Sequence, residues 1–327
     1  MMGGGSWGTA FAVVLADAGS QVTLWTRGDE MAADINQFHR NSRYHPDVDL
    51  PDSIIATTDP QEALQSAEIV VLAVPAQSLR ANLKDWAQWI SDEAVFVSLM
   101  KGIELGTSMR MSEVIAEATG ADPARIAVVS GPNLAKEIIA RQPTATTVAA
   151  STQASAIAIQ QACTTDYFRP YWTTDVIGTE IGGAVKNVIA VANGIAVGMG
   201  LGENSQSSLI TRGLAEIGRL GVALGADPLT FLGLAGVGDL VATCQSPLSR
   251  NRTFGENLGK GLSVEETIAV TNQTCEAYKS CQPILELAQK LGVEMPITAE
   301  VVEVLHFDKP PRELLSSFMA RDTKSEL

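Results

Sequence analysis

The chain has 327 residues and a mass of 34.5 kDa, the length of about two domains. Apolar residues make up 46% of it and charged residues 18%, which excludes a disordered chain and allows large buried cores. The formal net charge of −14 repels nucleic acids and anionic membrane surfaces, so we expect neither as a partner, and a phosphorylated ligand must be bound by local basic residues.

The chain begins with a glycine-rich segment in which Gly3, Gly5 and Gly8 satisfy the pattern GxGxxG. A helix-like stretch over residues 9–18 and a strand-like run at 22–26 follow it. Glycines in this context allow a tight turn and a close approach of the backbone to a pyrophosphate at the helix N-terminus. The pattern therefore favours a dinucleotide-binding loop over a flexible terminus.

Only Met1 and Met2 precede these glycines, although a dinucleotide-binding fold needs a strand there, near the middle of its sheet. We expect the first strand to be missing, which would leave unpaired backbone groups on the neighbouring strands. A start assigned too far downstream is favoured over a fragment as the explanation.

Short apolar runs alternate with helix-like segments in the first half of the chain. The predicted strands are residues 22–26, 54–57, 69–74, 95–99, 126–129 and 147–150, and the predicted helices between them include 76–90 and 108–119. This alternation predicts a Rossmann-type α/β fold with a parallel, doubly wound sheet.

Arg27 follows the strand-like run at 22–26 and lies 19 residues after Gly8, where an acidic residue would indicate NAD. A guanidinium at this place can pair with a 2′-phosphate, so we expect NADP or NAD as the cofactor. A solvated surface arginine is the alternative interpretation.

From about residue 175 the pattern changes to long segments rich in Ala, Leu, Ile and Gly. Helical spacing extends over residues 177–199, 206–224, 264–271 and 281–291. We therefore expect a dinucleotide-binding domain over residues 1–174 and an all-α substrate and catalytic domain over residues 175–327, closely apposed because no linker separates them.

Lysine is the obvious candidate for proton transfer in this chain. Lys186 is the only Lys or Arg between Arg169 and Arg212, and it lies inside an apolar helical pattern. A partly desolvated lysine suits the proton transfer that accompanies hydride transfer at a carbon bearing oxygen. A lysine whose stem reaches from the helix to solvent is the alternative.

Further polar residues follow strands or form turns. Lys101 and the Ser-Gly-Pro-Asn segment at residues 130–133 both follow predicted strands, at the sheet edge where open parallel sheets bind ligands. Asp239 lies in a glycine-flanked turn and could orient a lysine. The Ser-Arg-Asn-Arg segment at residues 249–252 offers hydroxyl, guanidinium and amide groups that suit phosphate oxygens, although a solvated loop has the same composition.

The cysteines and histidines indicate no metal site. The four cysteines form no CxxC pair, which fits reduced cytosolic thiols, and the three histidines form no HxxH or HExxH. The longest nearly apolar run, residues 188–202, is shorter than the roughly 20 residues of a membrane span. We expect a soluble cytoplasmic protein without a secretory signal or a membrane-inserted segment.

Taken in order along the chain, these segments resemble the bacterial NAD(P)-dependent glycerol-3-phosphate dehydrogenases. The matching pieces are residues 3–9, 98–104, 130–132, 186–188, Asn204, and residues 211–216, 233–240 and 249–252. Asn133 stands where many members have Ser or Thr, and Thr274 and Ala277 replace the more usual Val and Gly.

The resemblance implies reversible hydride transfer between NAD(P)H and dihydroxyacetone phosphate, giving sn-glycerol 3-phosphate for glycerophospholipid synthesis. It implies that Lys186 moves the proton at the C2 oxygen and that Lys101 touches both substrate and cofactor. It implies a substrate site lined by Gly131, Asn133, Asp239, Ser249, Arg250 and Asn251, the last three around the phosphate. It also implies cofactor contacts from Ser6, Trp7, Arg27, Tyr44, Ala135, Arg250 and Glu276.

Two other interpretations remain. A β-hydroxyacid dehydrogenase of the 6-phosphogluconate or hydroxyisobutyrate type would carry Lys-x-x-x-Asn, whereas here Asn187 directly follows Lys186 and Ala190 takes the later position. A non-catalytic remnant is the second alternative, which the short N-terminus favours and the intact candidate residues oppose. We also expect a homodimer.

Overall fold

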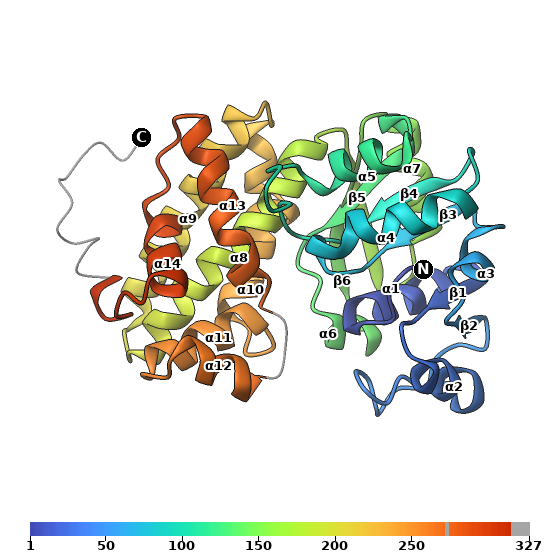
Figure 1. Ribbon diagram of the computed structural model, residues 1–327, viewed down its shortest axis with the longest axis horizontal. Helices are drawn as coiled ribbons and strands as arrows, with labels where there is room; N and C mark the ends of the chain where they lie inside the picture. The colour runs from blue at the N-terminus through green and yellow to red at the C-terminus, as the bar shows by residue number, and fades with distance from the viewer. Residues whose placement is uncertain (272–274, 315–327) are drawn as a thin grey trace.

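The structure is a computed structural model of the chain that describes residues 1–271 and 275–314. Thr274 and the end of the expected second domain lie outside these residues. The described chain consists of an α/β part and a helical part that lie side by side (Figure 1).

The strands of the α/β part form one layer. They are β1 (Val22–Trp25), β2 (Ile54–Thr57), β3 (Ile69–Leu72), β4 (Val95–Ser98), β5 (Ile126–Ser130), β6 (Thr144–Ala150) and β7 (Phe168–Thr173). β2 pairs with β1, and β3 to β7 pair in chain order. The apolar runs that predicted β3 to β6 are mostly buried, as expected for strands covered on both faces, whereas β1 and β2 are only partly buried.

Residues 1–3 lie between β1 and β3 and join the two groups of strands. The backbone N–H of Trp25 donates to the Met1 carbonyl (2.8 Å), and the Met2 N–H donates to the Val71 carbonyl (2.7 Å). Met2 is fully buried and bridges to both neighbouring strands in parallel. The prediction that these neighbours lack a partner was therefore wrong at these positions, because a few residues suffice to pair the ends of both strands next to the glycines.

The sheet is not parallel throughout, which corrects the prediction at its far edge. β5 and β6 pair antiparallel, with Ala127 opposite Ala150, and β7 runs parallel to β6. The sequence pattern does not predict β7, because Arg169 and Pro170 interrupt its apolar run. A proline is tolerated there because β7 is an edge strand, with no ladder partner on one of its sides in the described part of the chain.

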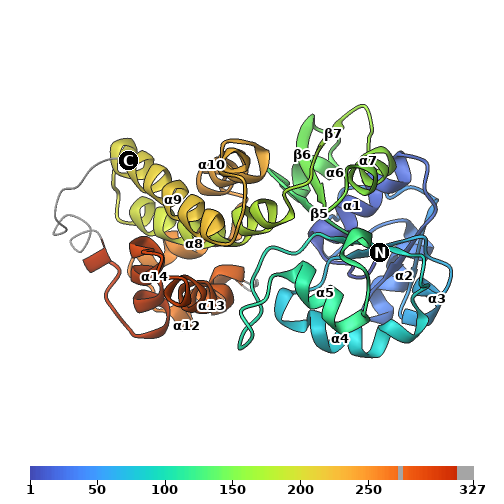
Figure 2. The ribbon, with the colours of Figure 1, turned by 90° about the horizontal axis from the view of Figure 1, so that it is seen from above.

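Helices cover both faces of the sheet (Figure 2). They are α1 (Ser6–Asp17), α2 (Asp29–Phe38), α3 (Pro60–Leu64), α4 (Leu79–Trp86), α5 (Met111–Thr119), α6 (Ala135–Ile139) and α7 (Gln153–Ala162). Successive strand residues point to opposite faces, so Val71 packs in a cluster with Phe11 of α1, whereas Val70 packs in another with Leu79 of α4. The expected helix at 76–90 is α4 flanked by two 3-10 turns.

The helical part is built around one central helix, α8 (Val176–Gly198). The other helices of this part are α9 (Glu203–Ala223), α10 (Asp239–Gln245), α11 (Arg250–Gly259), α12 (Val264–Thr271), α13 (Glu276–Lys290) and α14 (Pro296–His306). α8 is the one described helix long and apolar enough to cross a membrane, but 89% of its most apolar window is buried inside the protein. Its apolar composition is therefore explained by its place in the helical core.

Glycines allow α8 and α11 to pack backbone against backbone. A Cβ atom on Gly255 of α11 would lie 2.1 Å from the Val191 carbonyl oxygen, and one on Gly194 of α8 would lie 2.1 Å from the Arg252 carbonyl oxygen. Because no side chains separate the two helices here, the start of α11 lies against α8 near Asn187, where Asn251 donates to the Asn187 amide oxygen (2.9 Å).

Candidate active site

One buried carboxylate joins two lysines from different parts of the fold. The Nζ atom of Lys186, in the middle of α8, lies 2.6 Å from Oδ1 of Asp239, and the Nζ atom of Lys101, after β4, lies 2.6 Å from Oδ2 of the same residue. The side chains of Asp239, Lys186 and Lys101 are 2%, 7% and 16% exposed. The structure therefore brings together three residues that the sequence singled out separately.

Each of the two ammonium groups has one further partner. Lys186 also donates to the hydroxyl of Thr243, which in turn donates to Asp239 (3.3 Å), and Lys101 donates to the carbonyl oxygen of Gly131 (3.0 Å). An ammonium group has three N–H donors. One N–H on each lysine is thus without a partner among the residues that the structure describes, and is available to an oxygen of a ligand.

Burial changes the chemistry of Lys101. Desolvation lowers its pKa to about 8, the nearby Lys186 also lowers it, and Asp239 opposes both. A lysine whose pKa lies near neutrality can both donate a hydrogen bond to an oxygen and exchange a proton with it.

Glycines also place Asp239 beside the lysines. The π-helical turn Leu234–Gly238 leads directly into α10, whose first residue is Asp239. A Cβ atom on Gly182 of α8 would lie 2.3 Å from the carbonyl oxygen of Ala235. Because this contact is backbone to backbone, the turn sits directly on α8, one helical turn from Lys186.

Unpartnered polar atoms of the α/β part lie at the end of β5 and in the segment that follows it. Both amide atoms of Asn133 and the hydroxyl of Ser130 are buried without a hydrogen-bond partner within residues 1–271 and 275–314. A Cβ atom on Gly183 would lie 2.6 Å from the Ser130 hydroxyl and 3.3 Å from Cγ of Lys101, so Ser130 lies beside the lysine stem. Buried polar groups are normally satisfied, and these atoms therefore suit a bound polar ligand.

The candidate phosphate segment forms the N-terminus of α11. Ser249 is its N-cap, and its hydroxyl accepts from the Arg252 backbone N–H (3.3 Å), while Arg250 is exposed. The Asn251 amide is already used: it donates to Asn187 and accepts from the Ala277 N–H (3.2 Å). Within the residues that the structure describes, the donors left here for a ligand are the Arg250 guanidinium and the backbone N–H groups of the helix before Arg252.

The glycine-rich loop has the shape that a dinucleotide requires. A Cβ atom on Gly3 would lie 2.6 Å from the Ala73 carbonyl oxygen and one on Gly8 would lie 2.0 Å from the Gly3 carbonyl oxygen, whereas a Cβ on Gly5 would meet nothing within 4 Å. Gly5 is the N-cap of α1, so open space borders the positive end of that helix. The indole N–H of Trp7 is buried and unpartnered in the described part of the chain. These residues fit a pyrophosphate group.

The other expected cofactor residues surround this loop or lie on the helical part. Arg27 is exposed after β1, Tyr44 is half-buried, and Ala135 is the first residue of α6. Glu276 begins α13, where burial raises the pKa of its carboxyl and the charge of Arg250 opposes this.

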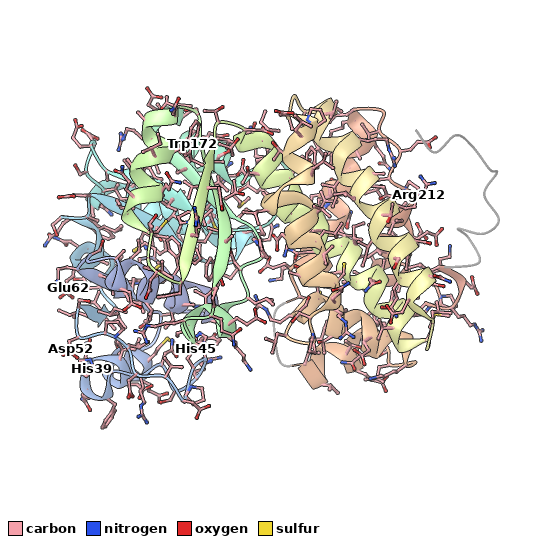
Figure 3. The ribbon with its side chains drawn as sticks, turned by 180° about the vertical axis from the view of Figure 1, so that it is seen from behind. His39, His45, Asp52, Glu62, Trp172 and Arg212 are labelled. Atoms are coloured by element: carbon pink, nitrogen blue, oxygen red, sulfur yellow. The ribbon has the colours of Figure 1, made fainter. Side chains whose placement is uncertain are left out.

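Two neighbours of the site are not predicted by the sequence analysis. Thr243 contacts Lys186, and its position one helical turn after Asp239 is the signal that could reveal it. His45, labelled in Figure 3, lies with Nε2 at 2.9 Å from the carbonyl oxygen and 3.3 Å from the hydroxyl of Ser6, beside the glycine-rich loop. Its only sequence signal is that it follows Tyr44.

A hollow and the distribution of metal-ligating side chains also bear on ligand binding. The hollow of about 410 Å³ lies along α9 and is lined by Asn204, Ser207, Ser208, Thr211 and Arg212. Across the described ranges, no group of three or more His, Cys, Asp or Glu side chains could hold a metal ion.

Comparisons with known proteins identify the family of the chain. The family models for the N-terminus and the C-terminus of NAD-dependent glycerol-3-phosphate dehydrogenase match residues 1–156 and 175–316. The glycerol-3-phosphate dehydrogenase (NAD(P)+) of Streptomyces griseus subsp. griseus is 60% identical over 326 residues, covering 100% of this chain and 97% of the relative. That of Corynebacterium glutamicum is 57% identical over 327 residues, covering 100% and 98%. The crystal structure of glycerol-3-phosphate dehydrogenase from Coxiella burnetii aligns with a TM-score of 0.93 at 36% identity, covering 98% of both chains.

Proposed function

This chain belongs to the family of NAD-dependent glycerol-3-phosphate dehydrogenases, and from that premise we propose that it reduces dihydroxyacetone phosphate to sn-glycerol 3-phosphate with NADPH or NADH, reversibly. The observation that carries this function is the pair of lysines on one buried carboxylate, in a chain that matches the family over its full length. The product is a precursor of glycerophospholipids. The β-hydroxyacid dehydrogenase and the non-catalytic remnant are not favoured by these relatives.

We propose that the cofactor binds at the glycine-rich loop, where it supplies the hydride. The pyrophosphate would lie at the N-terminus of α1, against Gly5, Ser6 and Trp7. The further cofactor contacts would come from Arg27, Tyr44, Lys101, Ala135, Arg250 and Glu276. The exposed guanidinium of Arg27 is free to pair with a 2′-phosphate, which supports the use of NADP.

We propose that Lys186 gives the proton to the C2 oxygen as the hydride arrives at C2, and takes it back in the reverse reaction. Asp239 and Thr243 hold two of its N–H groups and so direct the third toward the substrate side. Lys101 would donate to the same oxygen and stabilise its developing negative charge. The loss of one such donor reduces transition-state stabilisation by about 2.7–4 kcal/mol in other enzymes.

We propose that the substrate phosphate lies at the start of α11, near Ser249, Arg250 and Asn251. Since the Asn251 side chain is engaged with Asn187, its contribution would come from the backbone N–H rather than from the amide group. Gly131 and Asn133 would line the opposite wall, where the unpartnered amide of Asn133 can hydrogen-bond the substrate's hydroxyl or carbonyl oxygen.

We further propose two domains, residues 1–174 and 175–327, in a cytoplasmic homodimer without nucleic-acid or membrane partners. The division is supported by the start of the second family model at residue 175 and by the separate hydrophobic cluster of the helical part. The net charge of −14 supports the absence of nucleic acid. Light scattering on the purified chain tests the dimer.

The decisive test is NADPH oxidation with dihydroxyacetone phosphate, using wild type and Lys186→Ala. We expect wild-type turnover, no measurable turnover in Lys186→Ala, and equal NADPH binding by both in fluorescence titrations. Lys260→Ala, which removes an exposed lysine, is the matched control and should behave as wild type. Near-normal turnover in Lys186→Ala would refute the role of this lysine, and turnover of 2-hydroxyacids instead would refute the substrate.

A further inference from the structure

A second buried ion pair joins the two parts of the fold near the lysines. Glu180 of α8 lies with Oε2 at 2.6 Å from Nη1 of Arg110, which precedes α5. The side chains of Glu180 and Arg110 are 4% and 14% exposed. Like the pair formed by Lys101 and Asp239, this contact connects the α/β part with the helical part.

Glu180 makes further hydrogen bonds to the start of α5. Its carboxylate accepts from the backbone N–H of Ser112 (2.8 Å) and from the Ser112 hydroxyl (2.6 Å). Burial raises the pKa of the Glu180 carboxyl, while Arg110 and the two Ser112 donors oppose this by favouring the carboxylate. A carboxylate of α8 thus caps a helix of the other part of the fold.

The same contact fixes the segment that carries Lys101. Arg110 forms an antiparallel bridge with Ile103, two residues after Lys101. Ile103 is fully buried and packs in the hydrophobic cluster of the helical part. At the tip of this segment, Lys290 of α13 donates to the Ser108 hydroxyl (3.2 Å). Residues 101–110 are therefore held against the helical part along their length.

We propose that Glu180 is a positioning residue that sets the place of Lys101 relative to Lys186. Glu180 and Lys186 are six residues apart on one buried helix, a rise of about 9 Å. Because the helix is rigid, it holds the catalytic lysine directly and the Lys101 segment through Arg110. The inference rests on the roles proposed above for the two lysines.

The experiment compares Glu180→Gln with Glu113→Gln. Both remove a carboxylate that pairs with Arg110, but Glu113 belongs to α5 itself, is 47% exposed and does not cross between the parts. We expect Glu180→Gln to lower kcat between about tenfold and about 10²-fold, as for a displacement of about 1 Å, with an unchanged dissociation constant for NADPH. Glu113→Gln should keep wild-type kcat.

The pH profile of kcat separates positioning from a merely structural role. In Glu180→Gln the Lys101 segment loosens and water reaches Lys101. Since Lys186 and Asp239 still face this lysine, the loss of desolvation raises its pKa from about 8 toward the ordinary value. The alkaline limb of the profile should then move to higher pH in Glu180→Gln and stay in place in Glu113→Gln.

Equal kcat values and superimposable pH profiles for the two variants would overturn the inference, whether or not Glu180→Gln unfolds at a lower temperature. If Glu180→Gln does not fold, Arg110→Lys replaces it, because lysine keeps the charge but cannot bind Glu180 and Glu113 together. We expect the same lower kcat and the same shift of the alkaline limb in this variant. A wild-type chain without turnover would refute the proposed function, and this inference with it.

Discussion

Replacing Lys101 with methionine should stabilise the folded chain near neutral pH and abolish its activity. Burial lowers the pKa of Lys101 from 10.5 to about 8. This lowering of the pKa corresponds to a loss of about 3 kcal/mol in the free energy of unfolding. The side chain is 16% exposed, so solvent screening reduces this value little.

The sign follows from the protons bound in each state. Between about pH 8 and 10.5 the unfolded chain holds a proton on Lys101 that the folded chain has released, so stability rises with pH across this window. Below about pH 8 both states are protonated and the folded chain bears the full penalty. Methionine has no charge to bury, and Asp239 keeps Lys186 as its partner.

Urea unfolding of wild type and Lys101→Met across this range measures the effect. We expect the variant to be more stable by about 3 kcal/mol near pH 7, and the difference to shrink by about 1.4 kcal/mol per pH unit above pH 8. Lys260→Met removes an equal charge from an exposed site and corrects for the change in net charge. Turnover should be lost because the hydrogen-bond donor that we propose for the C2 oxygen is gone.

A difference in stability that does not vary with pH would refute this reasoning, since it would show that the folded and unfolded chains bind the Lys101 proton equally. A variant less stable than wild type near neutral pH would also contradict it. In that case the attraction of Asp239 outweighs the desolvation of the lysine.

Two further predictions concern the frame of the helical part. Burial raises the pKa of Glu216 to about 7, so between pH 4.5 and about 7 the folded chain holds a proton that the unfolded chain releases, and the free energy of unfolding falls by about 3 kcal/mol as the pH rises. Glu216→Gln should flatten this pH dependence in urea unfolding, and an unchanged slope would contradict the prediction. Gly255→Ala forces a Cβ atom against the Val191 carbonyl oxygen and should lower the free energy of unfolding by about 1–3 kcal/mol, as measured by thermal unfolding. Gly28→Ala is the control, because a Cβ atom there meets nothing and should lower stability little. Equal melting temperatures for the two variants would exclude the close contact between α8 and α11.

Local patterns predict most of the fold, and tertiary context decides the remainder. The strands β3 to β5 are visible as short continuous apolar runs, and the long helix α8 is visible as a long apolar segment. Helix α10 has only seven residues, and the buried face of α11 includes Asn251 and Gly255, so few apolar residues mark either helix. The antiparallel turn into β6 has no local signal either, because strand direction depends on the connection and not on composition.

The candidate site illustrates the same division. Lys101, Lys186 and Asp239 are each noticeable in the sequence, as a cation after a strand, a lone cation in an apolar helix and an acid between glycines. Their contact joins positions 53 and 138 residues apart, and it depends on glycine contacts that bring backbones together. Such contacts have no period in the sequence, so the pairing follows from the fold alone. Thr243 is hidden for the same reason.

The ratio of two lysines to one carboxylate has a functional consequence. If each lysine had its own buried acid, the cluster would be neutral and would attract a phosphorylated substrate weakly, in a chain whose net charge is −14. Sharing Asp239 leaves one formal positive charge and one unengaged N–H on each lysine within the described residues. This arrangement destabilises the folded chain, because burial disfavours the charged form of Lys101 and lowers its pKa. Stability is thus lowered at the place where we propose that the substrate binds, as expected of a preorganised electrostatic site.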